Sequence, residues 1–210
     1  SMDLGGATVS LDLEYSPNAA GNGANDGGTA TYDDTYGSGM GAGITAKYDA
    51  LTIGVYGAEI ENNTPRAAGQ DAVQDVFDGV WYAKYSFGPV SIGYSESYLD
   101  QGLTGTASAA TTAKTVRTSA GIFESESMSI AFNVNDNLSI SYTETEDTYD
   151  AQDNASTAVA DVTMETEALQ AAYSMGAMSV KIYNMETSNP GYDSDAATGS
   201  ATEIALGLSF

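Results

Sequence analysis

Carboxylate side chains are the most numerous groups in this sequence that could do chemistry. Five of them lie close together: Glu144, Glu146, Asp147, Asp150 and Asp153. Carboxylate oxygens are the ligands that Ca²⁺ prefers, but the spacing here is not that of an EF-hand loop. We therefore interpret the stretch as a solvated acidic loop, keep Ca²⁺ binding as the weaker hypothesis and predict no cofactor. Two smaller acidic pairs receive the same interpretation: Asp33 with Asp34, and Asp193 with Asp195.

Other catalytic side chains are missing from the sequence, which contains no Cys and no His. This removes disulfide bonds, thiol nucleophiles, imidazole general bases and the usual zinc ligands. Paired carboxylates remain, but the sequence gives none of them the distinctive environment that a catalytic pair needs. We predict that the protein is not an enzyme. Nucleic acid is a poor partner as well, because 29 acidic residues face only 6 Lys and Arg and the net charge is −23.

A second group of polar side chains occupies alternate positions in segments that otherwise carry apolar residues. It comprises Asp12, Glu14, Lys47, Thr52, Tyr56, Lys84, Gln170 and Lys181. Alternate positions of a strand face the same side of a sheet. In a β-barrel these side chains would line a wet lumen, where carboxylates opposing ammonium groups would set a transverse field. The alternative is that they face solvent on one side of a soluble β-sandwich.

Strands are the elements that must position these side chains, because large apolar residues recur at every second position and helical periodicity is nearly absent. The ten predicted strands span residues 9–15, 44–48, 51–56, 81–87, 90–95, 128–134, 138–142, 169–175, 178–182 and 202–210. Very short turns alternate with loops of roughly a dozen residues or more, which is typical of an antiparallel, up-and-down transmembrane β-barrel. We predict a single barrel domain over residues 1–210. No apolar run reaches the roughly 20 residues that a transmembrane helix needs.

Aromatic residues fall at both ends of the predicted strands. Tyr15, Tyr94 and Tyr142 would form an upper girdle, and Tyr48, Phe87, Tyr173 and Phe210 a lower one beside the short turns. An apolar band roughly 25 Å tall needs about five outward positions in each strand. Several strands supply only three or four before a carboxylate follows. Those strands would face a subunit interface, or their acids would lie at the outer headgroup level, where divalent cations bridging lipid phosphates neutralise them.

The last strand carries Ile204, Leu206, Leu208 and Phe210 on one face. A barrel needs such a strand at its end, because the last strand must close the ring against the first. With the aromatic girdles, the acidic loops and the absence of Cys, this segment makes the chain resemble the C-terminal part of a Gram-negative general porin, most nearly of the alphaproteobacterial type. The resemblance covers nearly the whole chain.

The porin resemblance implies a cell outer-membrane location, contact with outer-membrane lipid and lipopolysaccharide, and a homotrimer. It implies that the terminal segment is a signal read by the barrel-assembly machinery, and that small hydrophilic solutes and ions diffuse passively through a channel. Acidic loops add a predicted cation preference, because a negative mouth concentrates cations within a Debye length of about 8–10 Å. Ten-stranded outer-membrane proteases match the strand number, but their chemistry resembles a His-assisted attack of water, and the chain has no His.

Several alternatives stay open at this point. Such porins usually have sixteen strands, so the ten predicted here would be the last ten, and no loop is assigned the family's constriction role. Ser1-Met2 is similar to Ser174-Met175 at a strand end, which favours a missing earlier strand over an expression scar. The start lacks the basic and apolar parts of a signal peptide, so an exported protein would be in a mature or truncated form. A complete ten-stranded barrel is another possibility. The alternative of a different class is a soluble, secreted acidic β-sandwich or adhesin-like binding module.

Overall fold

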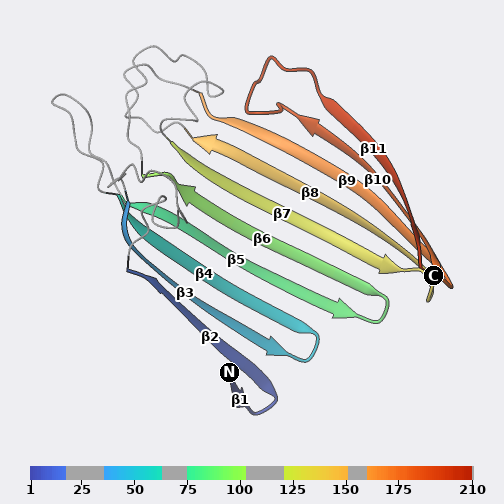
Figure 1. Cartoon of the computed structure of the whole chain (residues 1–210), viewed down its shortest axis with the longest axis horizontal. Coiled ribbons are helices and arrows are strands. Elements are labelled where there is room, and N and C mark those ends of the chain that lie inside the picture. The colour runs from blue at the N-terminus through green and yellow to red at the C-terminus, as the bar shows by residue number, and fades with distance from the viewer. Residues whose placement is uncertain (18–35, 63–74, 103–120, 151–159, 210) are drawn as a thin grey trace, which may run out of the picture.

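The computed structural model describes residues 1–17, 36–62, 75–102, 121–150 and 160–209. These residues form one sheet of eleven antiparallel strands, arranged in chain order (Figure 1). The strands are β1 (Met2–Leu4), β2 (Ala7–Ser16), β3 (Tyr36–Tyr48), β4 (Leu51–Asn62), β5 (Val76–Phe87), β6 (Val90–Asp100), β7 (Ile122–Asn133), β8 (Leu138–Asp150), β9 (Val162–Met175), β10 (Met178–Ser188) and β11 (Gly199–Leu208). The prediction of an all-β, up-and-down antiparallel fold is confirmed, with β1 added to the ten strands expected.

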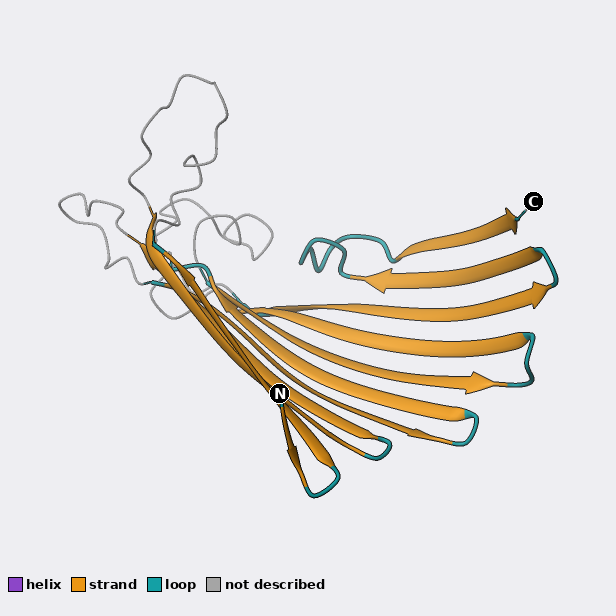
Figure 2. Ribbon diagram, turned by 60° about the horizontal axis from the view of Figure 1, so that its bottom comes forward, coloured by secondary structure: helices purple, strands orange, loops and turns teal. Residues whose placement is uncertain are grey.

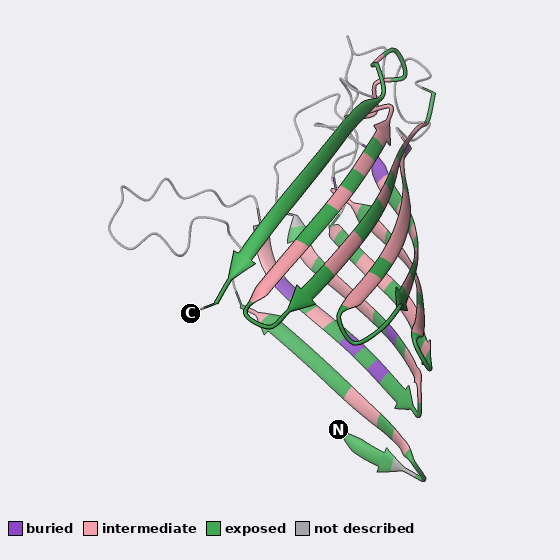
Figure 3. Cartoon of the chain, turned by 90° about the vertical axis from the view of Figure 1, so that its right-hand side faces the viewer, coloured by how far each residue is buried: buried purple, intermediate pink, exposed green. Residues whose placement is uncertain are grey.

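The sheet is a single curved layer (Figure 2). Its two edges, β1 and β11, lie toward the same side of the curve (Figure 3). In the described parts of the chain these edges do not pair with each other, so the strand order and curvature are those of a barrel wall. Within the same ranges, no helix is long and apolar enough to cross a membrane.

Short turns join the strands in pairs at one end of the sheet. Asp49-Ala50, Gly88-Pro89 and Gly176-Ala177 make two-residue connections, as their composition predicts. Asp49 has a φ of 51°, in the left-handed region that Asp and Asn tolerate better than most residues. Between β7 and β8, the Asn135 side chain accepts hydrogen bonds from the backbone N–H groups of residues 137 and 138, at 2.9 and 3.0 Å. These turns fix the register of each hairpin.

The strands extend further from the short turns than the sequence analysis predicts. The interpretation of residues 144–150 as a loop is wrong, because β8 continues to Asp150 and pairs with β9 up to Tyr149. Four of the five clustered acids, Glu144, Glu146, Asp147 and Asp150, are therefore strand residues. Asp153 lies outside the described residues, as do Asp33 and Asp34. In residues 144–150 no apolar residue recurs at every second position, because acids and threonines fill the segment. Only its hydrogen bonds to the neighbouring strands show that it is a strand.

The two faces of the sheet differ in composition and in exposure. Neighbouring residues of β3 illustrate this: Thr45 is 8% exposed and Ile44 is 44% exposed. Along β7 the positions that carry Ser are half-buried, while Met128, Ile130 and Phe132 are exposed. Side chains converge on the concave side of a curved sheet and spread apart on the convex side. We therefore call the concave side the polar face and the convex side the apolar face.

Candidate functional site on the polar face

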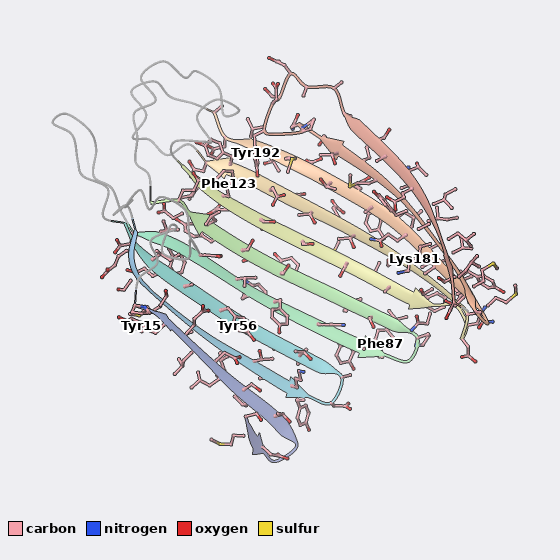
Figure 4. All side chains as sticks on the ribbon, viewed as in Figure 1. Tyr15, Tyr56, Phe87, Phe123, Lys181 and Tyr192 are labelled. Carbon is pink, nitrogen blue, oxygen red and sulfur yellow. The ribbon has the colours of Figure 1, made fainter. Side chains whose placement is uncertain are left out.

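All eight polar residues singled out from the sequence lie on the polar face. The strand registers establish this, because Lys47 pairs with Thr52, and Thr52 pairs with Lys84. In the same way, Gln170 and Lys181 share a face with Tyr183 and Ala172, their register partners on the adjacent strand. Figure 4 shows Tyr56 and Lys181 on different parts of the sheet. The structure therefore places the eight residues on one surface, spread over strands β2 to β10.

A row of hydroxyl groups crosses this surface from β2 to β10. Its members are consecutive register partners, interrupted only by Gly54: Ser10, Thr45, Tyr82, Ser95, Ser127, Thr145, Thr166 and Thr187. Two pairs are hydrogen-bonded, Ser127 to Thr145 at 3.0 Å and Thr166 to Thr187 at 3.2 Å. Hydroxyl groups both donate and accept hydrogen bonds. The row therefore offers water and small polar solutes an uncharged hydrogen-bonding surface.

Two tyrosine rings lie flat over glycines of the preceding strand. A Cβ at Gly43 would stand 2.0 Å from the ring of Tyr56, and one at Gly54 would stand 2.4 Å from the ring of Tyr82. The two rings are stacked, with centroids 6.5 Å apart and planes 5° apart. The Tyr56 hydroxyl is also hydrogen-bonded to Thr45. Glycine at both positions therefore lets the rings lie along the wall instead of projecting away from it.

The lysines of the polar face lie near the short turns, and some of its acids lie farther along the strands. Lys47, Lys84 and Lys181 lie within three residues of the short-turn end of their strands. Asp78 and Asp147 lie nine residues from that end. Other acids of this face lie at the level of the lysines: Asp3 pairs with Thr8, the partner of Lys47, and Glu203 lines a groove together with Lys181.

A groove of about 510 Å³ marks the acidic level on the N-terminal half of the polar face. Asp12, Glu14 and Asp78 line it together with Gly41, Gly43 and Tyr56. Carboxylates from β2 and β5 lie at the two sides of the groove, and Gly41 and Ala58 are the small residues between Glu14 and Asp78. The described part of the chain contributes no lysine to this groove. It is therefore suited to attract cations and to repel anions.

Sequence reasoning missed four charged residues on this face: Asp3, Asp78, Asp147 and Glu203. Asp78 lies on the polar face because its register partner is Ala58, two residues from Tyr56. Glu203 pairs with Tyr183, two residues from Lys181. The alternation would have identified Asp78 and Asp147 if the predicted strands had been extended by a few residues, and Glu203 already lies within the predicted strand over residues 202–210.

The described aromatic residues that the sequence analysis assigns to girdles lie on the apolar face. Tyr94 and Tyr142 follow the last apolar position of their strands, where their hydroxyls donate to carboxylates. The Tyr94 hydroxyl lies 2.5 Å from Glu96, and that of Tyr142 lies 3.1 Å from Glu167. At the short-turn ends lie Tyr48, Phe87 and Tyr173, while Tyr15 lies at the opposite end of β2. Phe210 lies outside the described residues, and Ile204, Leu206 and Leu208 share the apolar face of β11.

Carboxylates also form two rows on the apolar face beyond the girdle tyrosines. One row runs through Glu96, Glu126, Glu146 and Glu165, and the other through Glu144, Glu167 and Glu186. Each member is the direct cross-strand partner of the next. Within the described ranges, no group of three or more acidic side chains is arranged so that it could hold a metal ion.

The architecture is similar to that of a porin. A solved structure of a porin matches the chain with a TM-score of 0.60 and 12% sequence identity, and the match covers 100% of this chain. It covers 60% of the porin chain, so this chain spans less than two thirds of that protein's length. No family model and no curated protein matches the sequence. At this identity the likeness concerns the fold alone, and the chain has a porin-like fold.

Proposed function

We propose that the chain forms the wall of a water-filled channel through which small hydrophilic solutes and ions diffuse passively. The observation that carries the proposal is the distribution of side chains over the curved sheet. Polar side chains lie on its concave face. Apolar side chains lie on the convex face and are exposed, such as Ile204 at 68% and Leu206 at 61%. This distribution fits lipid outside and water inside. A soluble sandwich would instead cover its apolar face with a second layer.

We propose that the channel prefers cations. The support is the groove lined by Asp12, Glu14 and Asp78, together with Asp147 at a comparable level on β8. Carboxylates along a narrow passage raise the local concentration of cations. The three lysines near the short turns would act at the opposite end, so the charge along the passage is unequal.

An outer-membrane location is part of the same proposal, with outer-membrane lipid and lipopolysaccharide around the apolar face. The exposed apolar edge strand β11 supports recognition by the barrel-assembly machinery through Ile204, Leu206 and Leu208. A homotrimer is the assembly that the porin resemblance implies, and a native mass measurement in detergent would test it.

We also propose that these strands belong to a wider barrel, as the C-terminal part of a porin would. Each strand is antiparallel to the next, so β1 and β11 run in the same direction. Closing the ring between them would need a parallel pair, which the even-numbered antiparallel barrels of bacterial outer membranes do not contain. The match to 60% of a porin chain supports the same proposal.

Planar lipid bilayers test the channel directly. The detergent-folded protein should add discrete conductance steps in KCl, and a KCl gradient should give a reversal potential of the sign set by cation flow. Absence of steps would overturn the channel, and a reversal potential of anionic sign would overturn the selectivity alone. A monodisperse protein that stays soluble without detergent would favour the secreted binding module instead.

A further inference from the structure

A groove of about 480 Å³ lies on the apolar face, in the half of the sheet away from the short turns. Its aromatic side chains are Phe77, Trp81 and Tyr98, and its carboxylates are those of Glu96, Glu124, Glu126 and Glu146. The register places Trp81 opposite Glu96 on β6. Glu126 and Glu146 continue the same row on β7 and β8. The groove therefore has aromatic rings toward β5 and carboxylates toward β8, and we call it the upper groove.

Two glycines keep the aromatic side of the upper groove open. Gly57 and Gly79 are register partners on the apolar face, so the position between Phe77 and Trp81 on β5 carries no side chain. The Phe77 ring leans over this position, since a Cβ at Gly79 would stand 3.0 Å from it. Phe77 is 42% exposed and Trp81 is 38% exposed. Ring surface is therefore available to a ligand in the groove.

Hydrogen bonds hold the carboxylate nearest the rings. The indole N–H of Trp81 donates to Glu96 at 2.9 Å, and the hydroxyl of Tyr94 donates to the other oxygen of Glu96 at 2.5 Å. Among the described residues, no lysine or arginine lies on the apolar face. In this part of the chain, the protein therefore supplies no cation to the glutamates of the upper groove.

Aromatic rings beside carboxylates favour an organic cation as the ligand. The face of an aromatic ring attracts an ammonium group, and tryptophan does so most strongly. The acids of the described ranges are not arranged to hold a metal ion, whereas the volume of the upper groove is in the range of sites for small organic molecules. Charge and ring surface together indicate a ligand with an amine or quaternary ammonium group.

A second groove, of about 380 Å³, continues from the upper groove toward the short turns. The residues that line it include Ala83, Tyr85, Ile92, Tyr94, Met128 and Ile130. Ala83 lies two residues from Trp81 on the same face of β5. At the boundary between the grooves, the rings of Trp81 and Tyr94 are in contact, with centroids 5.3 Å apart. This lower groove therefore extends the carboxylate site along a surface of hydrocarbon and tyrosine side chains.

We propose that the two grooves together bind a lipid whose headgroup carries an amine or quaternary ammonium group. The cation lies between Trp81 and Glu126, and one alkyl chain lies along Ile92 and Ile130. A free organic cation would use the upper groove alone and would leave the adjoining apolar groove without a role. The inference rests on the proposed contact of the apolar face with lipid, and it adds a headgroup preference to that contact.

Trp81 is the only tryptophan in the sequence, so its fluorescence reports on the upper groove directly. The protein, folded in dodecyl maltoside micelles, is titrated at low salt with dodecyltrimethylammonium. The emission of Trp81 should change and then saturate. Further dodecyl maltoside, which has the same alkyl chain and no charge, should cause no such change. Absence of a saturable change in a protein that conducts overturns the inference alone, whereas a saturable change in a protein that does not conduct overturns only the channel.

Two substitutions test the carboxylates. Glu126→Gln with Glu146→Gln should weaken the binding of dodecyltrimethylammonium by about tenfold at low salt, because two charges leave the upper groove. The matched control, Glu167→Gln with Glu186→Gln, removes two charges from the apolar face of β9 and β10, outside both grooves, and should retain the wild-type affinity. Equal weakening in the two variants would assign the effect to net charge and overturn the site.

The lower groove is tested separately, because it distinguishes a lipid from a free cation. Ala83→Leu narrows this groove and should weaken the binding of dodecyltrimethylammonium by about three- to tenfold. Its response to tetramethylammonium, which has the headgroup and no chain, should equal that of the wild type. An unchanged affinity for the amphiphile would make a free organic cation the occupant and overturn the lipid assignment. Heat-modifiable gel migration reports folding, and Met128→Gln decides the same question if Ala83→Leu does not fold.

Discussion

On the apolar face, strands β2, β3 and β5 carry apolar side chains along most of their length, whereas β6 to β10 carry them mainly near the short turns. In β2 the apolar run extends from Val9 to Tyr15. In β8 it ends at Tyr142 and is followed by Glu144 and Glu146. The first region is tall enough for a full hydrocarbon band, and the second covers only its lower part. In the proposed channel, the height of the lipid contact would therefore change around the wall.

The carboxylate rows on the apolar face of β6 to β10 destabilise the folded sheet. Like charges directly opposite each other on neighbouring strands are destabilising, and Glu126 faces both Glu96 and Glu146. In the described part of the chain, the lysines all lie on the polar face, so none neutralises these rows. In the proposed channel, the rows would therefore stay hydrated or attract cations from outside, at or above the lipid headgroups and not among the acyl chains.

The largest expected effect comes from placing the same charge in the two regions. Ile44→Lys puts an ammonium group in the middle of the tall apolar band and should lower the free energy of unfolding by about 2–4 kcal/mol, as lysine does on the lipid face of a barrel. Glu146→Lys puts it among carboxylates and should cause no loss. Urea titration of the protein folded into lipid vesicles measures both. Similar losses in the two variants would mean that the regions do not differ in their contact with lipid.

A smaller effect should come from relieving repulsion within the acidic rows. Glu146→Gln removes a charge facing Glu126 and Glu165 and should raise the free energy of unfolding by about 0.2–1 kcal/mol for each facing pair at low salt. Salt should reduce the gain, because exposed charges are screened. Glu59→Gln is the matched control, since Glu59 lies on the same face opposite Met40 and Phe77. An equal gain in both variants would assign the effect to net charge and not to the rows.

The two regions also differ in how far the sequence predicts them. Around Asp49-Ala50, apolar residues alternate with Lys47 and Thr52, so the strands, their turn and their faces follow from the period alone. The loop-side half of β8 has no such period, because Thr145, Glu146 and Asp147 are all polar. Its strand state depends on hydrogen bonds from β7 and β9, which a local pattern does not contain.

The residues of the candidate site also differ in how far the sequence predicts their positions. Alternation assigns Lys84 and Gln170 to the polar face, because a side chain's face depends only on its position within its own strand. The ring centroids of Tyr192 and Phe123 lie 5.5 Å apart, and this contact depends on the path of the connection between β10 and β11 across two intervening strands. No local pattern in the sequence predicts the path that brings residue 192 to residue 123. Long-range contacts made by a loop therefore need the folded structure.

The smallest effect on stability should come from a substitution at the boundary between apolar side chains and carboxylates on the apolar face. The Tyr142 hydroxyl lies 3.3 Å from Glu144 and 3.1 Å from Glu167, two carboxylates that face each other. Tyr142→Phe removes this shared donor and should lower Tm slightly, by about 2 °C or less, with a larger fall at low salt as the two acids repel more strongly. Tyr173→Phe is the matched change at the short-turn end, where the register partners Leu138 and Val180 carry no charge, and its effect should not depend on salt. A salt-dependent loss in Tyr142→Phe alone would show that tyrosine hydroxyls hold the acidic rows at the edge of the apolar band, and equal salt dependence in both variants would show that they do not.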